Sequence, residues 1–368
     1  MTGRRVLIAA GGTGGHVFPA LAVAQALRHQ GWHAEWVGSD RGLEARVIPA
    51  AGFGLHILKF SGVRGRGLLA LLSLPLRLIS ALTRAMAITM RARPEVVVAF
   101  GGYVTFPIGL IAWLQRIPLC VHEQNAVMGT ANRWLARIAR SVMISFPGTR
   151  FAPAGATLVG NPVRDAICAL PEPSMRYAQH TGPLRVLVVG GSLGASALNT
   201  SVPKALQLAV DAGASWEIWH QTGAATLPQV QSDYASRGLT ARCAAFIDEM
   251  PAAYQWADLL ICRAGASTVT EVAAVGVAAI FVPLPSAIDD HQTANARNLS
   301  DAQAAWTLAQ SDTLALQLAD VLKSATRDTL CARAVRARAL AKPEATQQVV
   351  AVVRQAVQGE TVRSGVRE

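Results

Sequence analysis

Short apolar runs alternate with longer stretches of helical periodicity along most of the chain. The runs are rich in Val, Ile and Leu, which is typical of strands buried on both faces of a parallel sheet, and their alternation with helices indicates βα units. One series of runs ends near residue 122, and a second begins near Leu184. The predicted strands are residues 5–10, 34–38, 95–100, 118–122, 184–190, 216–220, 259–262 and 278–282.

The two series of strands predict two domains. At 368 residues the chain exceeds what one hydrophobic core usually serves. Between the series lie the turn signals of Gly160-Asn161-Pro162 and a polar stretch up to Pro183, which are typical of an inter-domain connection. We therefore predict an α/β protein with two doubly wound domains, residues 1–163 and 164–340, that face one another across a cleft.

The longest apolar segment, residues 67–93, is predicted to be a helix that does not cross a membrane. Arg77, Arg84 and Arg91 interrupt it, so it contains no unbroken apolar span of about 20 residues. On a helix these arginines share one stripe, and the side chains at positions 69, 72, 76, 79 and 82 form a second, apolar face. Two interpretations stay open: a helix buried on two sides, or an arginine-rimmed patch that docks on anionic lipid.

Charge is distributed unevenly along the chain, which has a net charge of +11. Residues 1–163 hold 17 Lys or Arg against five Asp or Glu, whereas residues 164–368 hold 17 against 18. A basic half suits nucleic acid or an anionic membrane surface. Because no nucleic-acid recognition motif is present and the aromatic residues do not interleave with the basic ones, we expect no nucleic acid and favour the membrane surface.

The cysteines and the N-terminus indicate a protein of a reducing compartment. The five cysteines are widely spaced and include no Cys-x-x-Cys pair, so neither a disulfide framework nor a zinc site is expected. The apolar run of residues 6–10 is too short for a signal peptide and is predicted to be the first strand.

The first candidate for chemistry is the segment 11–16, Gly-Gly-Thr-Gly-Gly-His, which follows a strand and opens a helix. Glycines allow close approach of a ligand to the backbone, and free N–H groups at a helix N-terminus attract anions, so the turn is suited to phosphate. It matches neither the dinucleotide fingerprint, which requires glycine in place of Val17, nor the P-loop. The alternative is a tight turn whose glycines serve only helix packing.

Two further glycine turns follow predicted strands. Segment 190–195 reads Gly-Gly-Ser-Leu-Gly-Ala and also opens a helix, while segment 101–105 reads Gly-Gly-Tyr-Val-Thr. Three anion-ready turns on two domains would accommodate a nucleotide diphosphate and a second phosphorylated substrate. Segment 262–271 ends in Glu271, whose carboxylate could accept two hydrogen bonds from a ribose diol or could simply favour the helix dipole.

Together these motifs resemble the family of peptidoglycan glycosyltransferases that transfer N-acetylglucosamine from UDP-N-acetylglucosamine to undecaprenyl-diphosphate-N-acetylmuramoyl-pentapeptide. The likeness covers nearly the whole chain. The segments that carry it are residues 11–19, 101–103, 122–125 (His-Glu-Gln-Asn), 159–164 (Val-Gly-Asn-Pro-Val-Arg), 190–195, 246–248 (Phe-Ile-Asp), 262–271 and 289–292.

The resemblance implies a GT-B fold, with the acceptor and the membrane on the N-terminal domain and the donor on the C-terminal one. The last segment, residues 341–368, is expected to pack back on the first domain. The implied location is the cytoplasmic face of the bacterial inner membrane, with peripheral attachment and a role in cell-wall synthesis, cell shape and division. The implied membrane patch is Leu72, Leu76, Ile79, Leu82 and Trp113.

The resemblance also implies the site residues and the reaction, an inverting transfer to the acceptor's 4-hydroxyl with loss of UDP. His16 is the candidate base, because a helix N-terminus biases imidazole toward its neutral form; substrate binding and helix capping are its alternative roles. Tyr103 and Glu271 complete the implied catalytic set. The implied donor site is Thr13, Gly14, Gly15, Asn125, Arg164, Ser192, the Ile247 backbone at the uracil, Ala266, Ser267, Thr268, Val269, Thr270, Glu271 at the ribose and Gln292 at the sugar.

Neither a metal nor a cofactor is expected. The sequence has no Asp-x-Asp pair, and Asp289-Asp290-His291 is more typical of a turn than of a metal site. Backbone N–H groups near Ser192 are expected to meet the charge of the UDP leaving group instead. The turn 190–194, which includes Ser192, would thus hold UDP. Turns 11–15 and 101–103 would face the acceptor's lipid diphosphate.

The sequence departs from the family pattern at two positions, and it leaves several rival functions open. Leu193 and His291 stand where some relatives carry glutamine, which affects contacts with the donor but not the type of reaction. Rivals on a similar fold are a UDP-N-acetylglucosamine 2-epimerase, a transferase with a diacylglycerol acceptor, and a nucleotide-sugar-binding regulator. An epimerase has no need of an arginine-rimmed apolar helix.

Overall fold

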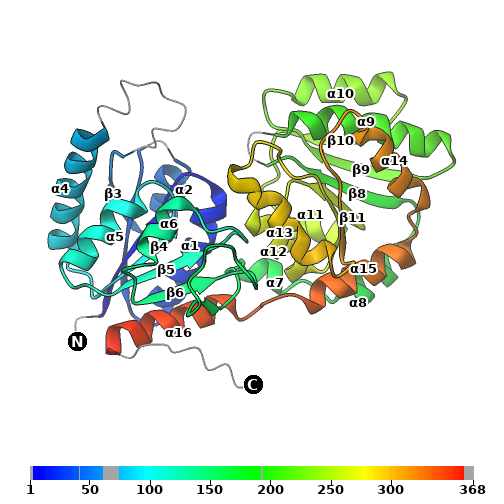
Figure 1. Cartoon of the computed structure of the whole chain (residues 1–368). Coiled ribbons are helices and arrows are strands. Elements are labelled where there is room, and N and C mark those ends of the chain that lie inside the picture. Colours follow the sequence, from blue (N-terminus) through cyan, green and yellow to red (C-terminus); the bar gives the residue numbers. More distant parts are fainter. Residues whose placement is uncertain (1–2, 41, 61–73, 192–193, 360–368) are drawn as a thin grey trace. The chain divides into compact units, whose positions relative to one another are not determined.

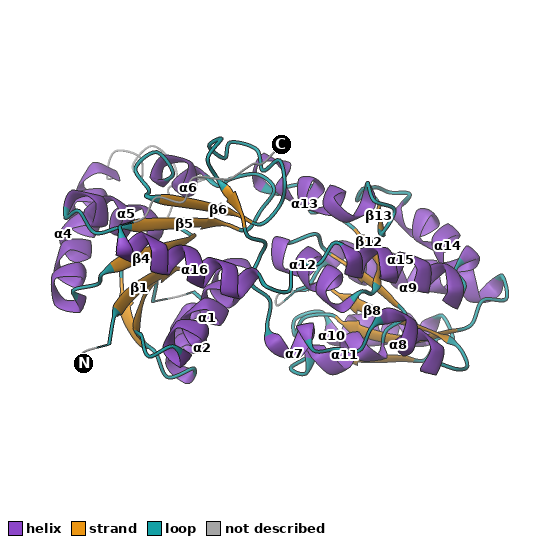
Figure 2. Ribbon diagram, turned by 90° about the horizontal axis from the view of Figure 1, so that it is seen from below, coloured by secondary structure: helices purple, strands orange, loops and turns teal. Residues whose placement is uncertain are grey.

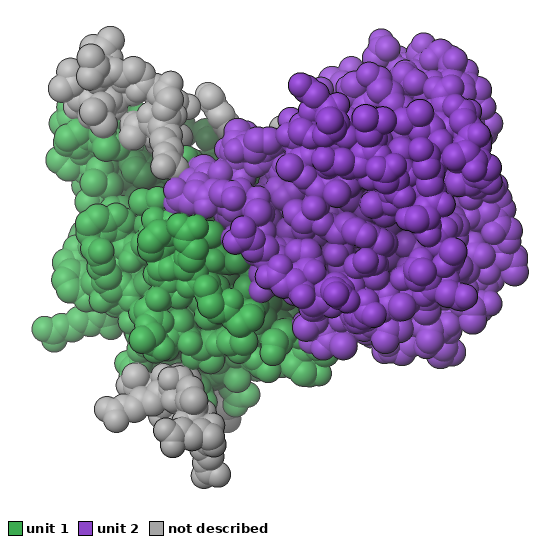
Figure 3. All heavy atoms as spheres, turned by 45° about the vertical axis from the view of Figure 1, so that its right-hand side comes forward, with its two compact units in different colours: residues 1–164, 342–368 green, residues 165–341 purple. Residues whose placement is uncertain are grey.

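The computed structural model of the chain describes residues 3–40, 42–60, 74–191 and 194–359 (Figure 1). The chain divides into two compact units, coloured in Figure 3. Unit 1 comprises the described residues of Met1–Arg164 and Lys342–Glu368, and unit 2 is Asp165–Ala341. Each boundary lies one residue beyond the predicted one.

Unit 1 is a seven-stranded parallel sheet in the order β3-β2-β1-β4-β5-β6-β7, with helices on both faces (Figure 2). The order reverses between β1 and β4, as in a doubly wound fold. The strands are β1 (Arg5–Ala10), β2 (His33–Gly38), β3 (Gly54–Ile57), β4 (Val96–Gly101), β5 (Leu119–Glu123), β6 (Ser141–Ile144) and β7 (Thr157–Leu158). The described helices are α1 (Gly14–His29), α2 (Glu44–Ala50), α4 (Leu74–Ala92), α5 (Thr105–Leu114), α6 (Thr130–Leu135) and α16 (Ala345–Gln358).

Unit 2 repeats this topology in a six-stranded parallel sheet of order β10-β9-β8-β11-β12-β13, with its reversal between β8 and β11. The strands are β8 (Leu184–Val189), β9 (Trp216–Gln221), β10 (Ala241–Ala244), β11 (Leu259–Cys262), β12 (Ala278–Phe281) and β13 (Ala305–Thr307). The helices are α7 (Asp165–Cys168), α8 (Pro173–Gln179), α9 (Ser196–Asp211), α10 (Leu227–Ser236), α11 (Met250–Trp256), α12 (Ala266–Val275), the 3-10 turn η1 (Ile288–Asp290), α13 (His291–Ser300), α14 (Leu314–Ser324) and α15 (Arg327–Ala339).

Helix α16 belongs to the core of unit 1, although it follows all of unit 2 in the sequence. It packs against α1 and lies beside β4, β5 and β6. Its valines recur at helical spacing, and Val349 and Val353 are fully buried in the cluster that contains Val17 and Val98. Burial of this apolar stripe is what fixes the returning chain on unit 1.

Helix α4 buries a stripe of small residues and exposes its large ones. Ala81, Ala85, Thr89 and Ala92 are the buried positions, and α4 packs against α5. Leu76 and Ile79 are 74% and 58% exposed, so the interpretation of a helix buried on two sides is wrong.

One member of the predicted membrane patch, Leu82, does not share that exposed face. Leu82 is half-buried and packs on the core of unit 1, because at about 100° per residue it is turned toward Thr89. Leu72 lies outside the described residues. No described helix is long and apolar enough to span a bilayer.

Candidate functional site

The predicted site residues gather at the carboxyl ends of the central strands in each unit. In unit 1, one glycine turn follows β1 and another follows β4, and these strands flank the point where the strand order reverses. In unit 2, the corresponding strands β8 and β11 precede the glycine turn at Gly190 and the turn at Gly265. Ligands of doubly wound sheets bind at such positions, so each unit presents one candidate half-site.

The two glycine turns of unit 1 pack directly on one another. Gly101 and Gly102 have positive φ angles of 117° and 93°. A Cβ atom at Gly102 would overlap the carbonyl oxygen of Gly11, and one at Gly101 would lie 2.8 Å from Cδ2 of His16. Only glycine tolerates both the positive φ angles and the lack of space for a Cβ atom at these two positions. The backbone of the second turn can therefore lie in direct contact with the first turn.

Two amides of the first turn are used inside the protein, contrary to the prediction that its N–H groups are available to a ligand. The N–H of Gly11 donates to the carbonyl of Gly101 at 3.3 Å. The N–H of Gly12 donates to Oε2 of Glu44 at 3.1 Å. The start of α1, after the N-cap Thr13, is a helix N-terminus, whose positive dipole end makes it the candidate in this turn for binding an anion.

His16 stands in the first turn of α1, as predicted. Its backbone N–H donates to the carbonyl of Thr13 at 3.1 Å, and the Cδ2–Nε2 edge of its ring lies against Gly101. Tyr103, just beyond Gly102, is 53% exposed, so its phenol is accessible to a ligand. The structure thus brings together His16, Tyr103 and both turns at one end of the sheet.

The His-Glu-Gln-Asn segment at the end of β5, residues 122–125, makes mainly internal hydrogen bonds. Glu123 is buried, and its Oε1 accepts hydrogen bonds from the N–H and from Nδ2 of Asn125 at 3.0 and 3.1 Å. His122 forms a hydrogen bond to the carbonyl of Gly160 at 2.9 Å, and burial lowers its pKa to about 4. Within this segment Asn125 is the predicted contact residue, and Glu123 fixes its side chain.

Arg164 lies in unit 1, although the sequence placed it at the start of the donor domain. Its guanidinium stacks over the ring of Phe18, 5.5 Å from the centroid. Phe18 belongs to α1, so this arginine is held near the first glycine turn.

In the glycine turn of unit 2, one backbone carbonyl accepts the hydrogen bonds that fix the conformation of the turn. The oxygen of Gly191 accepts the N–H of Gly194 at 2.9 Å and Nε2–H of Gln221 at 3.1 Å. A Cβ atom at Gly194 would overlap the carbonyl of Thr222. Residues 192–193, which include the predicted Ser192, lie outside the described residues.

A buried neutral network supports this second turn from behind. Asn199 donates from Nδ2 to the carbonyl of Thr222 at 2.9 Å. The ring of His220 bonds to Oδ1 of Asn199 at 3.1 Å and to the hydroxyl of Tyr234 at 2.9 Å. Burial lowers the pKa of His220 to about 3, so its ring is neutral at physiological pH and can donate from one nitrogen and accept at the other.

Helix α12 presents the predicted residues 266–271 in its first two turns, after the N-cap Gly265. Oε2 of Glu271 accepts a hydrogen bond from the hydroxyl of Tyr254 at 2.8 Å. Asn295 is fully buried and donates to the carbonyl of Ala264 at 3.1 Å, which fixes the turn before the helix. No periodic or motif signal marks Tyr254 or Asn295 in the sequence, because both act through contacts with distant segments.

Two further residues of the predicted donor site, Gln292 and Ile247, follow strands β12 and β10 of unit 2, which are not neighbours in the sheet. Gln292 accepts the N–H of Leu284 at its Oε1 at 2.9 Å, so its amide nitrogen is the group that a sugar hydroxyl could meet. Ile247 has a buried side chain and stands in the loop after β10, which suits the predicted contact through its backbone. His291 bonds to the carbonyl of Ile288 at 2.7 Å and so shapes the loop beside Gln292.

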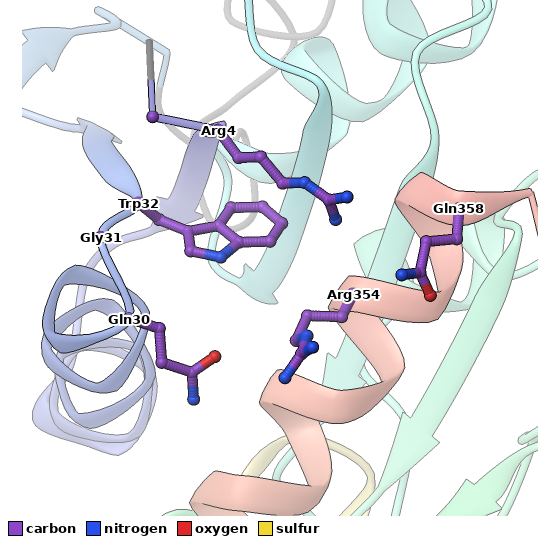
Figure 4. A pocket seen from close by; sticks show the side chains of 7 residues that line it. Arg4, Gln30, Gly31, Trp32, Arg354 and Gln358 are labelled. Carbon is purple, nitrogen blue, oxygen red and sulfur yellow. The ribbon is translucent and has the colours of Figure 1, made fainter. Parts of the chain in front are cut away.

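A hollow of about 480 Å³ lies at the opposite end of the unit 1 sheet, near the amino end of β1 (Figure 4). Arg4 and Arg354 point into it beside Trp32, and Arg4 stacks on that indole at 5.6 Å. Helices α1 and α16 both end here, and Gln30 and Gln358 are among the residues that line the hollow. The hollow is separate from the glycine turns.

Metal ligands do not cluster in the part of the chain that the structure describes: it has no group of three or more His, Cys, Asp and Glu side chains placed to hold an ion. Asp289 and Asp290 both have a φ of 53°, and Asp290 accepts the hydroxyl of Thr293 at 2.7 Å. The acidic pair thus shapes a turn before α13, which is one of the roles expected of Asp in loops.

Comparison with known families matches both units. The N-terminal domain of glycosyltransferase family 28 matches residues 6–144, and the C-terminal domain of that family matches residues 185–349. A protein of Bordetella parapertussis, 56% identical over 97% of this chain and 99% of its own, is named UDP-N-acetylglucosamine--N-acetylmuramyl-(pentapeptide) pyrophosphoryl-undecaprenol N-acetylglucosamine transferase. A protein of Ralstonia nicotianae with the same name is 50% identical over 94% of each chain.

Solved structures agree with the family match. The crystal structure of Acinetobacter baumannii MurG is 41% identical and aligns with a TM-score of 0.83 over 96% of this chain and 99% of that one. The S. aureus MnaA-UDP co-structure is 11% identical with a TM-score of 0.69, over 99% of this chain and 100% of that one, and so shows the fold alone. The predicted GT-B class, with two Rossmann-like units, is confirmed.

Proposed function

The chain belongs to glycosyltransferase family 28, and from this premise we propose how its own residues carry out the reaction. It is a UDP-N-acetylglucosamine-dependent N-acetylglucosaminyltransferase of peptidoglycan synthesis. It transfers N-acetylglucosamine to undecaprenyl-diphosphate-N-acetylmuramoyl-pentapeptide, and we assign the new bond to the acceptor's 4-hydroxyl. The family and the N-acetylglucosamine transfer that the resemblance implied are thereby confirmed.

In this reaction the acceptor hydroxyl attacks the anomeric carbon of N-acetylglucosamine as the bond to the UDP oxygen breaks. The configuration changes from α to β, the hydroxyl proton passes to a base, and UDP leaves as the anion. We place His16 as that base. The observation that carries this assignment is the place of its ring: His16 stands in the first turn of α1, and the Cδ2–Nε2 edge of its imidazole lies against Gly101 of the second glycine turn.

The position of His16 in the first turn of α1 also suits proton transfer. The positive end of the helix dipole disfavours imidazolium, so the ring is biased toward the form that accepts a proton. Tyr103 is exposed beside it and is a second candidate for contact with the acceptor. The acceptor's diphosphate would be met by segment 13–15 at the positive end of the α1 dipole.

We assign the donor mainly to unit 2. The turn 190–194 and the N-terminus of α9 would receive the diphosphate, and the Ile247 backbone would receive the uracil. Glu271, oriented by Tyr254, would accept hydrogen bonds from the ribose diol, and Gln292 would donate to the sugar. Asn125 and Arg164 are the corresponding contributions of unit 1.

We assign stabilisation of the negative charge on the leaving UDP to backbone N–H groups and the helix dipole rather than to a metal. Activity should therefore persist in a chelator such as EDTA at millimolar concentration. Loss of activity that only added Mg²⁺ restores would contradict this assignment.

We propose that α4 and α5 attach the protein peripherally to the cytoplasmic face of the inner membrane, through anionic lipid. The exposed face of α4 comprises Leu76, Ile79, Met86 and Met90, which lie within about 80° of one another around the helix. Exposed Trp113 and Leu114 stand at the end of α5, which packs beside α4. Arg84 and Arg91 follow one edge of the apolar face, where they can meet lipid phosphates.

Vesicle sedimentation tests the membrane assignment. Replacement of Leu76, Ile79 and Met90 by serine should abolish binding to vesicles that contain anionic lipid. The matched control is Leu316→Ser, which removes a similarly exposed leucine of α14 in unit 2. Unchanged binding of the triple variant, or equal loss in the control, would contradict the assignment.

The reaction itself is tested with purified protein, labelled UDP-N-acetylglucosamine and the undecaprenyl-linked acceptor. Formation of one UDP for each β-linked disaccharide is expected. Binding of the nucleotide sugar without transfer would favour a regulator, and conversion to the 2-epimer without acceptor would favour an epimerase. Either result would overturn the function.

A further inference from the structure

A fully buried carboxylate, Glu44, lies directly behind the first glycine turn. Its Oε1 accepts the N–H and the hydroxyl of Ser39 at 2.8 and 2.7 Å, and its Oε2 accepts the N–H of Gly12 at 3.1 Å. All three described partners are donors, which matches the acceptor-only character of an ionised carboxylate. Glu44 therefore joins the loop after β2 to the turn after β1.

The surroundings of Glu44 leave it little room to move. A Cβ atom at Gly11 would lie 2.7 Å from Oε1, and Cβ atoms at Gly38 and Gly42 would also overlap the Glu44 side chain. The N–H of Gly42 donates to Oγ of Ser39 at 3.0 Å, so the serine that holds Oε1 is itself held. Glycines on three sides thus enclose one carboxylate in a fixed position.

A short path of bonds connects Glu44 to the candidate base. Gly12, which donates to Glu44, has a φ of 95° and precedes Thr13. The carbonyl of Thr13 accepts the N–H groups of His16 and Val17 at 3.1 and 3.2 Å, and these bonds start α1. The direction in which α1 begins, and hence the place of the His16 ring against Gly101, depends on the conformation at Gly12.

We propose that Glu44 is a positioning residue for the transfer: by holding the Gly12 amide it sets the start of α1 and aims the His16 imidazole at the acceptor hydroxyl. Glu44 does not itself contact the reacting atoms. The role of His16 rests on the proposed function, but the hold of Glu44 on the turn does not. A buried negative charge behind a turn that faces a diphosphate is unfavourable for anion binding. The contribution of the Glu44 carboxylate is therefore to fix the shape of the turn.

The first test is the steady-state kinetics of Glu44→Gln. An amide keeps the size of the side chain but has only one oxygen acceptor. That oxygen should stay with the two Ser39 donors, which make the shorter bonds, so the NH₂ group faces Gly12 and the bond to the Gly12 amide is lost. We expect kcat to fall about 10- to 100-fold, as displacements on the order of 1 Å can do, while KM for UDP-N-acetylglucosamine changes less than twofold. Unchanged kcat, or a loss confined to the donor KM, would overturn the proposal.

Ser39→Ala is the matched control. It removes one bond to Oε1 and the acceptor of the Gly42 amide, but leaves the bond between Glu44 and Gly12 in place. If Glu44 only stabilised the fold, both variants would lose stability and keep kcat alike. Positioning predicts that Ser39→Ala retains kcat within about threefold, since the start of α1 is unchanged.

Hydrogen exchange followed by mass spectrometry on the full chain gives a readout that is independent of activity. Glu44→Gln should speed exchange in a peptide spanning residues 11–18 at least tenfold, and Ser39→Ala should leave that peptide as in the wild type. Wild-type protection in Glu44→Gln would overturn the inference. A His16 variant with normal kcat alongside faster exchange in Glu44→Gln would instead overturn the assignment of the base and leave the hold on the turn standing.

Discussion

The glycine turns of the two units look alike in sequence and are supported in different ways. In unit 1, a buried carboxylate holds the amide of Gly12, and a carbonyl holds the amide of Gly11. In unit 2, the carbonyl of Gly191 accepts two hydrogen bonds, and a network of neutral groups around His220 supports the backbone of Thr222 behind it.

The difference lies in which backbone groups the protein uses for its own structure. The first turn uses the N–H groups of Gly11 and Gly12, two donors that an anion would also need, whereas the described bonds of the second turn use one of its N–H groups, that of Gly194, and the Gly191 carbonyl. We infer that the first turn serves chiefly to place His16 and the second to receive the donor's diphosphate. A glycine signature alone therefore does not indicate which groups remain for a ligand.

The largest effect is expected at His16, which has no counterpart in the second turn. Replacement of His16 by alanine should lower kcat about 10²- to 10⁴-fold, the usual contribution of a general base. Binding of UDP-N-acetylglucosamine, measured by calorimetry, should change little. A normal kcat with a raised acceptor KM would show that His16 binds substrate and is not the base.

The next effect compares alanine at two glycines of positive φ. At Gly194 a Cβ atom would meet the carbonyl of Thr222, so Gly194→Ala must move the backbone and should destabilise by about 3 kcal/mol or more. At Gly12 no atom lies within 4 Å of the added Cβ, so Gly12→Ala has only the dihedral cost of about 1–2 kcal/mol. Urea unfolding measures both, and equal losses would contradict this difference in packing.

A smaller effect is expected at Glu271 of helix α12. Glu271 is assigned to the ribose, so Glu271→Gln should raise KM for the donor about 10- to 100-fold, as loss of hydrogen bonds to a charge does. The control Tyr254→Phe removes only the hydroxyl that orients Glu271 and should raise KM less than tenfold. A donor KM that is unchanged in Glu271→Gln would remove this residue from the donor site.

The smallest effect concerns pH and applies to both units. Burial lowers the pKa of His122 to about 4 and that of His220 to about 3, from an ordinary 6.5. Below pH 6.5 the unfolded chain binds protons that the native protein excludes, so stability falls as pH falls toward 4. Each histidine should contribute a loss of about 2 kcal/mol between pH 7 and pH 5.

Unfolding in urea at several pH values checks the sign of this dependence and its origin. The variant His122→Gln should lose about half of the histidine-linked proton uptake, because Gln does not titrate and His220 still does. Stability that rises on acidification over this range would contradict neutral, buried rings.

The central part of each sheet could be predicted from the sequence, whereas the edges could not. Strands β1, β4, β8 and β11 are buried along most of their length, so their continuous Val, Ile and Leu runs identify them. The missed strands β3, β6, β7, β10 and β13 lie at or next to the sheet edges and have two to four residues each. Such short strands lack a periodic signal, and pairing with a neighbour decides them.

The sequence by itself determined the family, the doubly wound units, the three glycine turns and the place of His16 at a helix N-terminus. These features are local: a strand, a turn and a helix start are encoded within about 20 contiguous residues.

Only the tertiary structure decided which amides the turns use internally, that Leu82 faces the core, and that Glu44, Glu123 and Tyr254 orient the predicted site residues. Such contacts join side chains to distant backbone, and a buried carboxylate is recognisable only when its donors are in place. The glycine turns are thus encoded by contiguous residues, whereas the side chains and backbone groups that pack behind them set their roles.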